Sequence, residues 1–252
     1  MKERRIWLLT WREFSEALSD TDLAILPVGV IEAHGPHLPL GTDFLISEWI
    51  SEQLAEELNA LIAPPVSYGV VSGLSGYWGS ITLRRETLQS IMYDVLTELA
   101  NNGFEKVVII NGHGGSGHVQ AISNAMKEAW SSVGLKSVLI NWWEFSSNVT
   151  SDMFKGSGGH AGVDEAAMIM AMDPGLVKGE PEEEEIYKIR RGILPVPLPG
   201  SVLAYQDDFV GRLPTPQESE EFARRILERI KIEVERIIEG WDRQDISPDI
   251  SL

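Results

Sequence analysis

The five histidines of the chain all fall in three glycine-containing segments, residues 29–43, 111–118 and 158–165. Carboxylates accompany the imidazoles in the first and third of these segments. Nitrogen and oxygen donors gathered at loop positions are what a borderline divalent ion such as Zn²⁺, Mn²⁺ or Fe²⁺ requires. The residues that suit a metal site best are Glu32, His34, Asp43 and His113.

The spacing of these four residues predicts that their side chains converge. If the chain stays extended after its first apolar run, Glu32 and His34 point to the same side, because side chains alternate along a strand. Asp43 falls at the expected start of a helix, where the positive end of the helix dipole favours a carboxylate. His113 follows the apolar run 106–110 and is flanked by glycines, which let the main chain approach a ligand closely.

Each candidate also has an ordinary structural interpretation. Asp43 can be only a helix N-cap, and His37 can merely hydrogen-bond main chain. His118 is expected to be a surface or helix-start residue rather than a ligand. His160 can be a loop histidine bound to main chain. Four compatible ligand types near strand ends still favour a metal site.

The composition limits the other chemistry that is open to the chain. There is no cysteine, which excludes disulfides, thiolate ligands and a cysteine nucleophile. With 38 acidic against 21 basic residues and a net charge of -17, the surface repels phosphate backbones and anionic lipids, so we expect neither nucleic-acid nor membrane binding. No apolar stretch approaches the roughly 20 residues of a membrane span, and the run 6–9 is too short for a secretory signal. We therefore expect a cytoplasmic protein.

The elements that must position the candidates alternate along the chain. Apolar runs predict strands at 23–30, 60–63, 106–110 and 137–140. Amphipathic stretches predict helices at 43–58, 86–101, 117–130, 164–172 and 217–238, and residues 192–214 read as an irregular loop. Strands separated by helices indicate an α/β fold with a parallel sheet covered on both faces, whose functional groups gather beyond the carboxyl ends of the strands. No repeat or composition break divides residues 1–252 into two domains.

At these residues the sequence resembles the creatininase, or creatinine amidohydrolase, family. Residues 29–43 are similar to the family signature G-x-x-E-Q-H-G-P-H-L-P-L-x-T-D, with Ala33 in place of the glutamine. Residues 111–115 and 160–165 resemble its second and third motifs, and weaker likeness runs from about residue 5 to about residue 235. The resemblance implies a three-layer α/β/α sandwich with a mostly parallel central sheet. It also implies a homo-oligomer, such as a hexamer.

The resemblance further implies unequal roles for the metal ligands. The residues that match Glu32 and His113 bind one ion, the residue that matches His34 binds the second, and the residue that matches Asp43 bridges both. The expected cofactor is therefore two divalent ions per chain, Zn, Mn or Fe, which share a hydroxide that acts as the nucleophile.

The third motif supplies the remaining catalytic candidates. Creatininase carries a further glutamate ligand two residues after the histidine of its second motif, and here that position is Gly115. Glu165, at the end of the third motif, is the candidate replacement, with a metal-binding and a catalytic role. His160 matches the histidine that is proposed as a proton shuttle, and an amide nitrogen leaves poorly until it is protonated.

Candidates for substrate binding are Trp142, Trp143, Trp78 and His37. The first two follow an expected strand and can form an aromatic wall for a planar substrate, although such tryptophans are more often core or subunit contacts.

The expected function is hydrolysis of a C–N bond in a small-molecule amide. Two substrates suit the resemblance: a cyclic amide such as creatinine, and a formamide as in deformylation of a formamidopyrimidine nucleotide. Gly159, Val163 and the segment 73–78 depart from the family pattern, so the substrate itself does not carry over. A non-catalytic metal-binding or assembly protein that retains the fold is the alternative. A metal-dependent phosphoesterase is disfavoured by the acidic charge balance.

Overall fold

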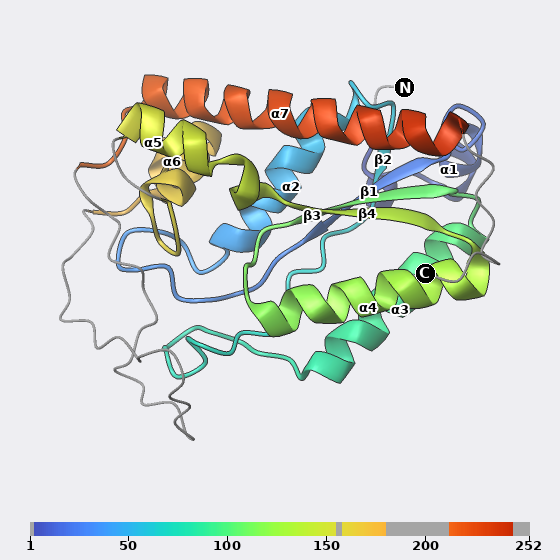
Figure 1. The fold of residues 1–252 in the computed structure, drawn as a ribbon, viewed down its shortest axis with the longest axis horizontal. Helices are drawn as coiled ribbons and strands as arrows, with labels where there is room; N and C mark the ends of the chain where they lie inside the picture. The colour runs from blue at the N-terminus through green and yellow to red at the C-terminus, as the bar shows by residue number, and fades with distance from the viewer. Residues whose placement is uncertain (1–2, 155–157, 180–211, 244–252) are drawn as a thin grey trace.

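The computed structural model describes residues 3–154, 158–179 and 212–243 (Figure 1). Within these ranges four parallel strands form one sheet in the order β2-β1-β3-β4. The strands are β1 (Leu23–Val28), β2 (Leu61–Ile62), β3 (Lys106–Asn111) and β4 (Lys136–Asn141). Every residue of β1 and β3 is buried, as expected for the central strands of a parallel sheet that is covered on both faces.

Helices cover both faces of the sheet and give the molecule three layers (Figure 1). One face carries α2 (Thr42–Ala55), α5 (Ser147–Phe154), α6 (Val163–Met172) and α7 (Pro216–Arg243). The other carries α1 (Trp11–Ala17), α3 (Arg85–Asn101) and α4 (Ser116–Val133). Short 3₁₀ turns lie at η1 (Ile6–Leu8), η2 (Trp142–Phe145) and η3 (Pro174–Leu176).

The apolar core is divided by the sheet into two clusters. Along β1, Leu23 and Ile25 belong to the cluster under α2, α6 and α7. Ala24 and Leu26, which alternate with them, belong to the cluster under α3 and α4. This alternation follows from the two-residue period of a strand, and it fixes β1 between the two helical layers.

The turns at the carboxyl edge of the sheet bring main chain into direct contact with the start of α2. The amide of Gly112, just after β3, donates to the carbonyl oxygen of Val28 at the end of β1 (2.8 Å). A Cβ atom at Gly112 would collide with the carbonyl oxygen of Asp43, and one at Gly29 would collide with the backbone of Phe44. Glycine at these two positions therefore lets α2 begin directly above the ends of β1 and β3.

The expected strands and the longer helices are present in the expected order, and the fold class is confirmed. Two helices were missed, α1 and α5. The first begins with a capping box between Thr10 and Glu13, a Thr-x-x-Glu signature that the sequence carries. The irregular segment expected at 192–214 lies outside the described residues except for 212–214. No helix within the described ranges is both long and apolar enough to cross a bilayer.

Candidate metal centre

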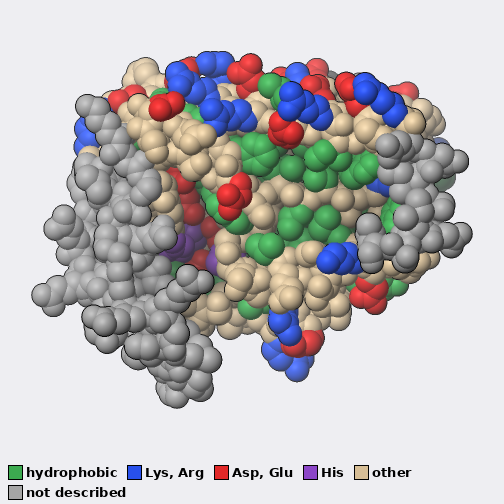
Figure 2. Space-filling view, viewed as in Figure 1, with side chains coloured by type: hydrophobic (Ala, Val, Ile, Leu, Met, Phe, Trp, Pro, Cys, Tyr) green, Lys and Arg blue, Asp and Glu red, His purple; other side chains and the backbone are tan. Residues whose placement is uncertain are grey.

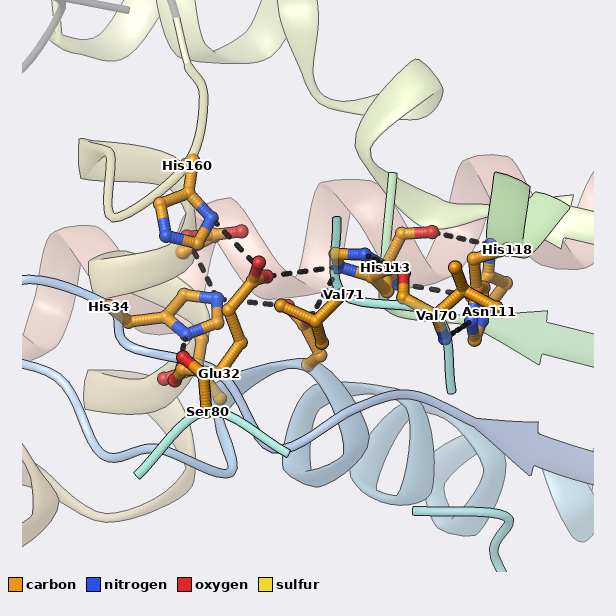
Figure 3. A network of polar contacts seen from close by, with 12 residues as sticks. Glu32, His34, Val70, Val71, Ser80, Asn111, His113, His118 and His160 are labelled. Atoms are coloured by element: carbon orange, nitrogen blue, oxygen red, sulfur yellow. Dashed lines mark hydrogen bonds and ion pairs between the residues drawn. The ribbon is translucent and has the colours of Figure 1, made fainter. Parts of the chain in front are cut away.

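Residues from all three motif segments meet beyond the carboxyl ends of β1 and β3 (Figure 3). The loop after β1 supplies two of them, the first turn of α2 one, the loop after β3 one, and the start of α6 with the loop before it two. They are Glu32, His34, Asp43, His113, His160 and Glu165. The first four residues are at most 7% exposed, so most of their surface is shielded from bulk solvent.

Asp43 lies at the centre of this cluster. Its Oδ1 atom is 3.0 Å from Nε2 of His34, and its Oδ2 atom is 2.9 Å from Nδ1 of His113. The side chain makes no capping hydrogen bond, and Gly41 occupies the N-cap of α2. The interpretation of Asp43 as only an N-cap is therefore wrong, and its two oxygens are directed as those of a bridging ligand would be.

The described residues contain three groups of potential ligands, and two of these groups share Asp43. Glu32, Asp43 and His113 form one of the two, and His34, Asp43 and Glu165 form the other; the third joins His160 to Glu32 and His34. In each group, one ligand atom per residue lies within 4.8 Å of the rest. Nδ1 of His113 is 3.2 Å from Oε2 of Glu32, and Nε2 of His34 is 3.8 Å from Oε2 of Glu165. These groupings match the two sets of ligands that the resemblance implies.

Each imidazole of the cluster donates a hydrogen bond from one ring nitrogen to a main-chain carbonyl oxygen. The three donors and their acceptors are His34 Nδ1 to Glu32 O (2.9 Å), His113 Nε2 to Val70 O (3.2 Å) and His160 Nε2 to Ala33 O (2.7 Å). When that nitrogen is the donor, the other ring nitrogen faces the carboxylates, where a bound ion would replace its proton. Such outward hydrogen bonds are usual for metal-bound histidines, because they fix the tautomer and the ring orientation.

The charge balance of the cluster calls for a cation. Burial alone would lower the pKa of His34, but the carboxylates of Asp43 and Glu165 raise it to about 9. Burial would also lower the pKa of His113, but hydrogen bonds with Asp43 and Glu32 outweigh this effect and raise it to about 10. Oε2 of Glu32 is buried and lies near two imidazole nitrogens, 3.2 Å from Nδ1 of His113 and 3.8 Å from Nδ1 of His160. Imidazole nitrogens and carboxylates that converge in this way fit a divalent cation.

The acidic groups and the third histidine respond to the same field. Burial would raise the pKa of Asp43, but the two imidazoles beside it bring that pKa below its usual range. Burial raises the pKa of Glu165 well above its ordinary value. Burial and the nearby charge of His34 lower the pKa of His160 to about 3, so its imidazole is neutral. A neutral imidazole beside a metal site can accept a proton and pass it on.

The cluster opens into a cavity of about 610 Å³. Histidine and acidic side chains are visible inside this hollow in Figure 2. Among the residues that line it are Asp43, His113, His160 and Glu165, together with Trp143, Glu144 and Asp164. A cavity of this size suits a small molecule, for which pockets of roughly 300–1,000 Å³ are typical.

The four candidates for substrate binding have different positions. Trp143 lines the cavity. Trp142 is fully buried in the core cluster under α7 and does not line it, so the expectation that both form an aromatic wall is corrected to Trp143 alone. Trp78 is 97% exposed and is not among the residues that line the cavity. His37 is buried and hydrogen-bonds the main chain of Ala161, which is the ordinary interpretation given for it above.

Sequence reasoning missed two polar residues that hold the site loops. Asn111, at the end of β3, accepts from the amide of His113 and donates to its carbonyl oxygen, both at 3.0 Å. Asp164 is buried and accepts from the amide of Gly159 (3.1 Å) and from the hydroxyl of Ser146 (3.2 Å). The available signal was that Asn111 lies in the second motif and Asp164 in the third.

His118 lies in the first turn of α4, which confirms one of the two positions expected for it. It is fully buried, so the other expected position, on the surface, is wrong. Its ring packs against the edge of the His113 ring, with centroids 5.1 Å apart.

Comparisons with known proteins agree with this geometry. A family model described as "Creatininase: Creatinine amidohydrolase" matches residues 7–237. The creatinine amidohydrolase of Pseudomonas putida is 30% identical over 186 residues, covering 67% of this chain and 72% of its own. The mycofactocin precursor peptide peptidase of Mycobacterium tuberculosis H37Rv is 27% identical, covering 90% and 88%. A solved creatininase variant described as the Zn-Zn type superposes with a TM-score of 0.76 at 23% identity, covering 94% and 98%. The chain belongs to the creatininase family of hydrolases that act on C–N bonds.

Proposed function

We propose that this protein is a metal-dependent amidohydrolase that uses two divalent ions to cleave the C–N bond of a small-molecule amide. The observation that carries the proposal is the pair of ligand groups that share Asp43 and open into one cavity. A site for a single ion does not require a central carboxylate whose two oxygens face two different groups of ligands. Family membership and the Zn-Zn state described for a solved relative support the same assignment.

The residues that would hold the ions divide between the two groups. Glu32 and His113 would hold one ion, His34 and Glu165 the other, and Asp43 both. Glu165 thus takes the place of the glutamate that creatininase carries where this chain has Gly115. Bound divalent ions supply a water that is acidic enough to act as a nucleophile near neutral pH, and they polarise a carbonyl.

His160 is placed to move the proton that the reaction requires. Its Nε2 donates to the carbonyl oxygen of Ala33, which orients the ring, and its Nδ1 lies 3.8 Å from Oε2 of Glu32 at the side of the cavity. The hydrogen bond to main chain therefore complements a role in proton transfer rather than excluding one. A neutral imidazole can take a proton from the nucleophile and give it to the leaving nitrogen, which needs it to depart.

The walls of the cavity favour a compact amide. The indole of Trp143 offers an apolar, planar surface on one side, against which a flat ring or amide plane can pack. Glu144 and Asp164 add acidic groups to the lining, and none of the described residues that line the cavity is Lys or Arg. We propose cyclic amides and formamides as the first substrate classes. The peptidase relative adds short peptides as a third.

The test is a substrate screen with protein reconstituted separately with Zn²⁺, Mn²⁺ and Fe²⁺. Release of product from creatinine-like lactams, N-formyl compounds and short peptides would be measured together with bound metal by elemental analysis. We expect close to two ions per chain and turnover in one substrate class. Protein that binds both ions but hydrolyses none of the three classes would favour the non-catalytic alternative. Protein that binds no ion would refute the proposal.

A further inference from the structure

We propose that His118 is a positioning residue that acts through Val70 to hold His113 in the orientation of a metal ligand. The inference rests on the proposed function, because it concerns how one of the two ligand groups is kept in shape. Nothing in the sequence pattern assigns this role, and His118 itself belongs to neither ligand group.

The two imidazoles bind the polar groups of one backbone residue between them (Figure 3). Nδ1 of His118 accepts a hydrogen bond from the amide of Val70 (3.3 Å). The carbonyl oxygen of the same residue accepts from Nε2 of His113 (3.2 Å). Val70 is thereby tied to α4 through its amide and to the ligand through its carbonyl.

The packing around this relay leaves His118 little freedom. The residue is fully buried in the first turn of α4, and its ring meets the ring of His113 at an interplanar angle of 87°. A Cβ atom at Gly69 would collide with the His118 ring. Glycine at that position therefore allows the ring to come close enough to accept from the next amide along the chain.

The Nε2 atom of His118 indicates that this residue does more than fill space in the core. Nδ1 accepts a hydrogen bond, so the ring proton is on Nε2. That atom is buried and has no hydrogen-bond partner among the described residues. An unpaired buried donor is costly, and an apolar side chain of similar size would avoid the cost. What a histidine provides here, and an apolar side chain does not, is the acceptor Nδ1 for the amide of Val70.

His113 differs from the other two imidazoles in where its outward acceptor comes from. His34 and His160 donate to Glu32 and Ala33, in the loop that carries the ligands themselves. His113 donates to a separate segment, in which the neighbours of Val70 hydrogen-bond to residues 82 and 83 and the amide of Val70 itself hydrogen-bonds to His118. With its Nε2 proton held there, Nδ1 faces Asp43 at 2.9 Å and Glu32 at 3.2 Å and is the nitrogen that would bind the ion in place of a proton. Loss of His118 should therefore weaken the ion that this group would hold and spare the ion held by His34 and Glu165.

The experiment compares His118→Leu with His118→Asn by titrating metal-free protein with Co²⁺, followed by its visible absorption and by calorimetry. The amide oxygen of asparagine occupies about the position of Nδ1 and can accept from Val70, whereas leucine fills space only. Residues that orient metal ligands typically contribute about 10–100-fold to metal affinity. We expect His118→Leu to weaken one of two Co²⁺ sites by that factor, and His118→Asn to restore most of it.

Two controls separate this role from general destabilisation. Ile122→Ala removes a buried side chain one turn further along α4; it should lower the melting temperature and leave both Co²⁺ affinities unchanged. Nitrogen NMR of unaltered metal-free protein should show that His113 keeps a proton on Nε2. In His118→Gln the amide lies further out, near the place of Nε2, and should bind Co²⁺ as weakly as the leucine variant does.

The outcomes distinguish the two proposals. If unaltered protein binds no Co²⁺, the proposed function itself fails. If unaltered protein binds two ions, and His118→Leu or His118→Gln binds both as tightly, the positioning role is overturned. Should the leucine variant not fold, the asparagine and glutamine variants and the tautomer of His113 decide the question, because equal affinities in those two variants or a proton on Nδ1 alone would refute the relay.

Discussion

Asp43 divides its two carboxylate oxygens between two imidazoles, and this single residue belongs to both ligand groups. Asp43→Asn keeps the shape of the side chain but removes the charge that both ions would share. We expect the variant to lose both ions and all turnover, as measured by elemental analysis and by rate on the same samples. An Asp43→Asn protein that retained two ions and ordinary activity would refute the bridging role.

Glu165 and His160 should give two further phenotypes at the scale of single residues. Glu165→Gln removes a ligand from one group only, so one ion should be weakened and the other retained. His160→Ala should keep both ions, while loss of proton transfer lowers the rate by about 10²- to 10⁴-fold. Metal content and turnover measured side by side distinguish the pair; equal metal loss in both variants would contradict the assigned roles.

The sequence was most informative about residues whose type alone indicates their chemistry, such as the carboxylates and imidazoles that bind metals. Glu32, His34 and His113 were found because carboxylates and imidazoles are rare together at loop positions. The burial of Trp142 and of His118 could not be predicted for a shared reason: residue type does not reveal burial, which is set by helices distant in sequence. Both side chains prove to be fully buried.

At the scale of elements, the close approach of α2 to the turn after β3 is the feature that aligns the ligands. Gly112→Ala would place a Cβ atom against the carbonyl oxygen of Asp43, and main chain cannot yield as a flexible side chain can. We expect a loss of about 1–3 kcal/mol in the free energy of unfolding, with reduced metal content because α2 must shift. Urea denaturation and elemental analysis would measure both.

Gly240→Ala provides the matched control for that change. Gly240 lies in α7 with open space around its Cα hydrogens. Alanine in a helix is favoured over glycine by about 0.5–1 kcal/mol, so this variant should be slightly more stable and bind metal normally. Equal destabilisation by the two substitutions would show that the tight contact with α2 is not the cause.

Helices and strands could be predicted where many of their residues are buried, because burial produces an apolar run or a regular apolar period in the sequence. β1 and β3 are apolar throughout and were found from that run alone. α1 and α5 have only 7 and 8 residues, with one and two buried positions, which is too few to produce a clear period. The spatial order of the strands is likewise absent from any local pattern, because it depends on which apolar faces meet after the chain folds.

At the scale of the whole molecule, the surface near the N-terminus is unusually apolar. Trp11 is 75% exposed, Leu8 53% and Trp7 39%. An apolar hollow of about 500 Å³ lies beside them against α3. Exposed aromatic area of this kind is common where subunits meet. We predict a homo-oligomer, a hexamer being the form that the family resemblance implied. Light scattering that returned the mass of one chain, 28.0 kDa, would refute this.

The convergence of distant segments on Asp43 has a consequence for a chain that has no cysteine. His113 lies 70 positions beyond Asp43, and Glu165 lies in α6, far along the chain from His34 in the same ligand group. Ions held there would act as reversible cross-links, fastening remote parts of the backbone where other proteins use disulfides. Ligands that bind only the folded state at 100 times their dissociation constant add about 2.7 kcal/mol. Chelation should therefore lower the melting temperature and speed proteolytic cleavage, whereas reducing agents should change neither.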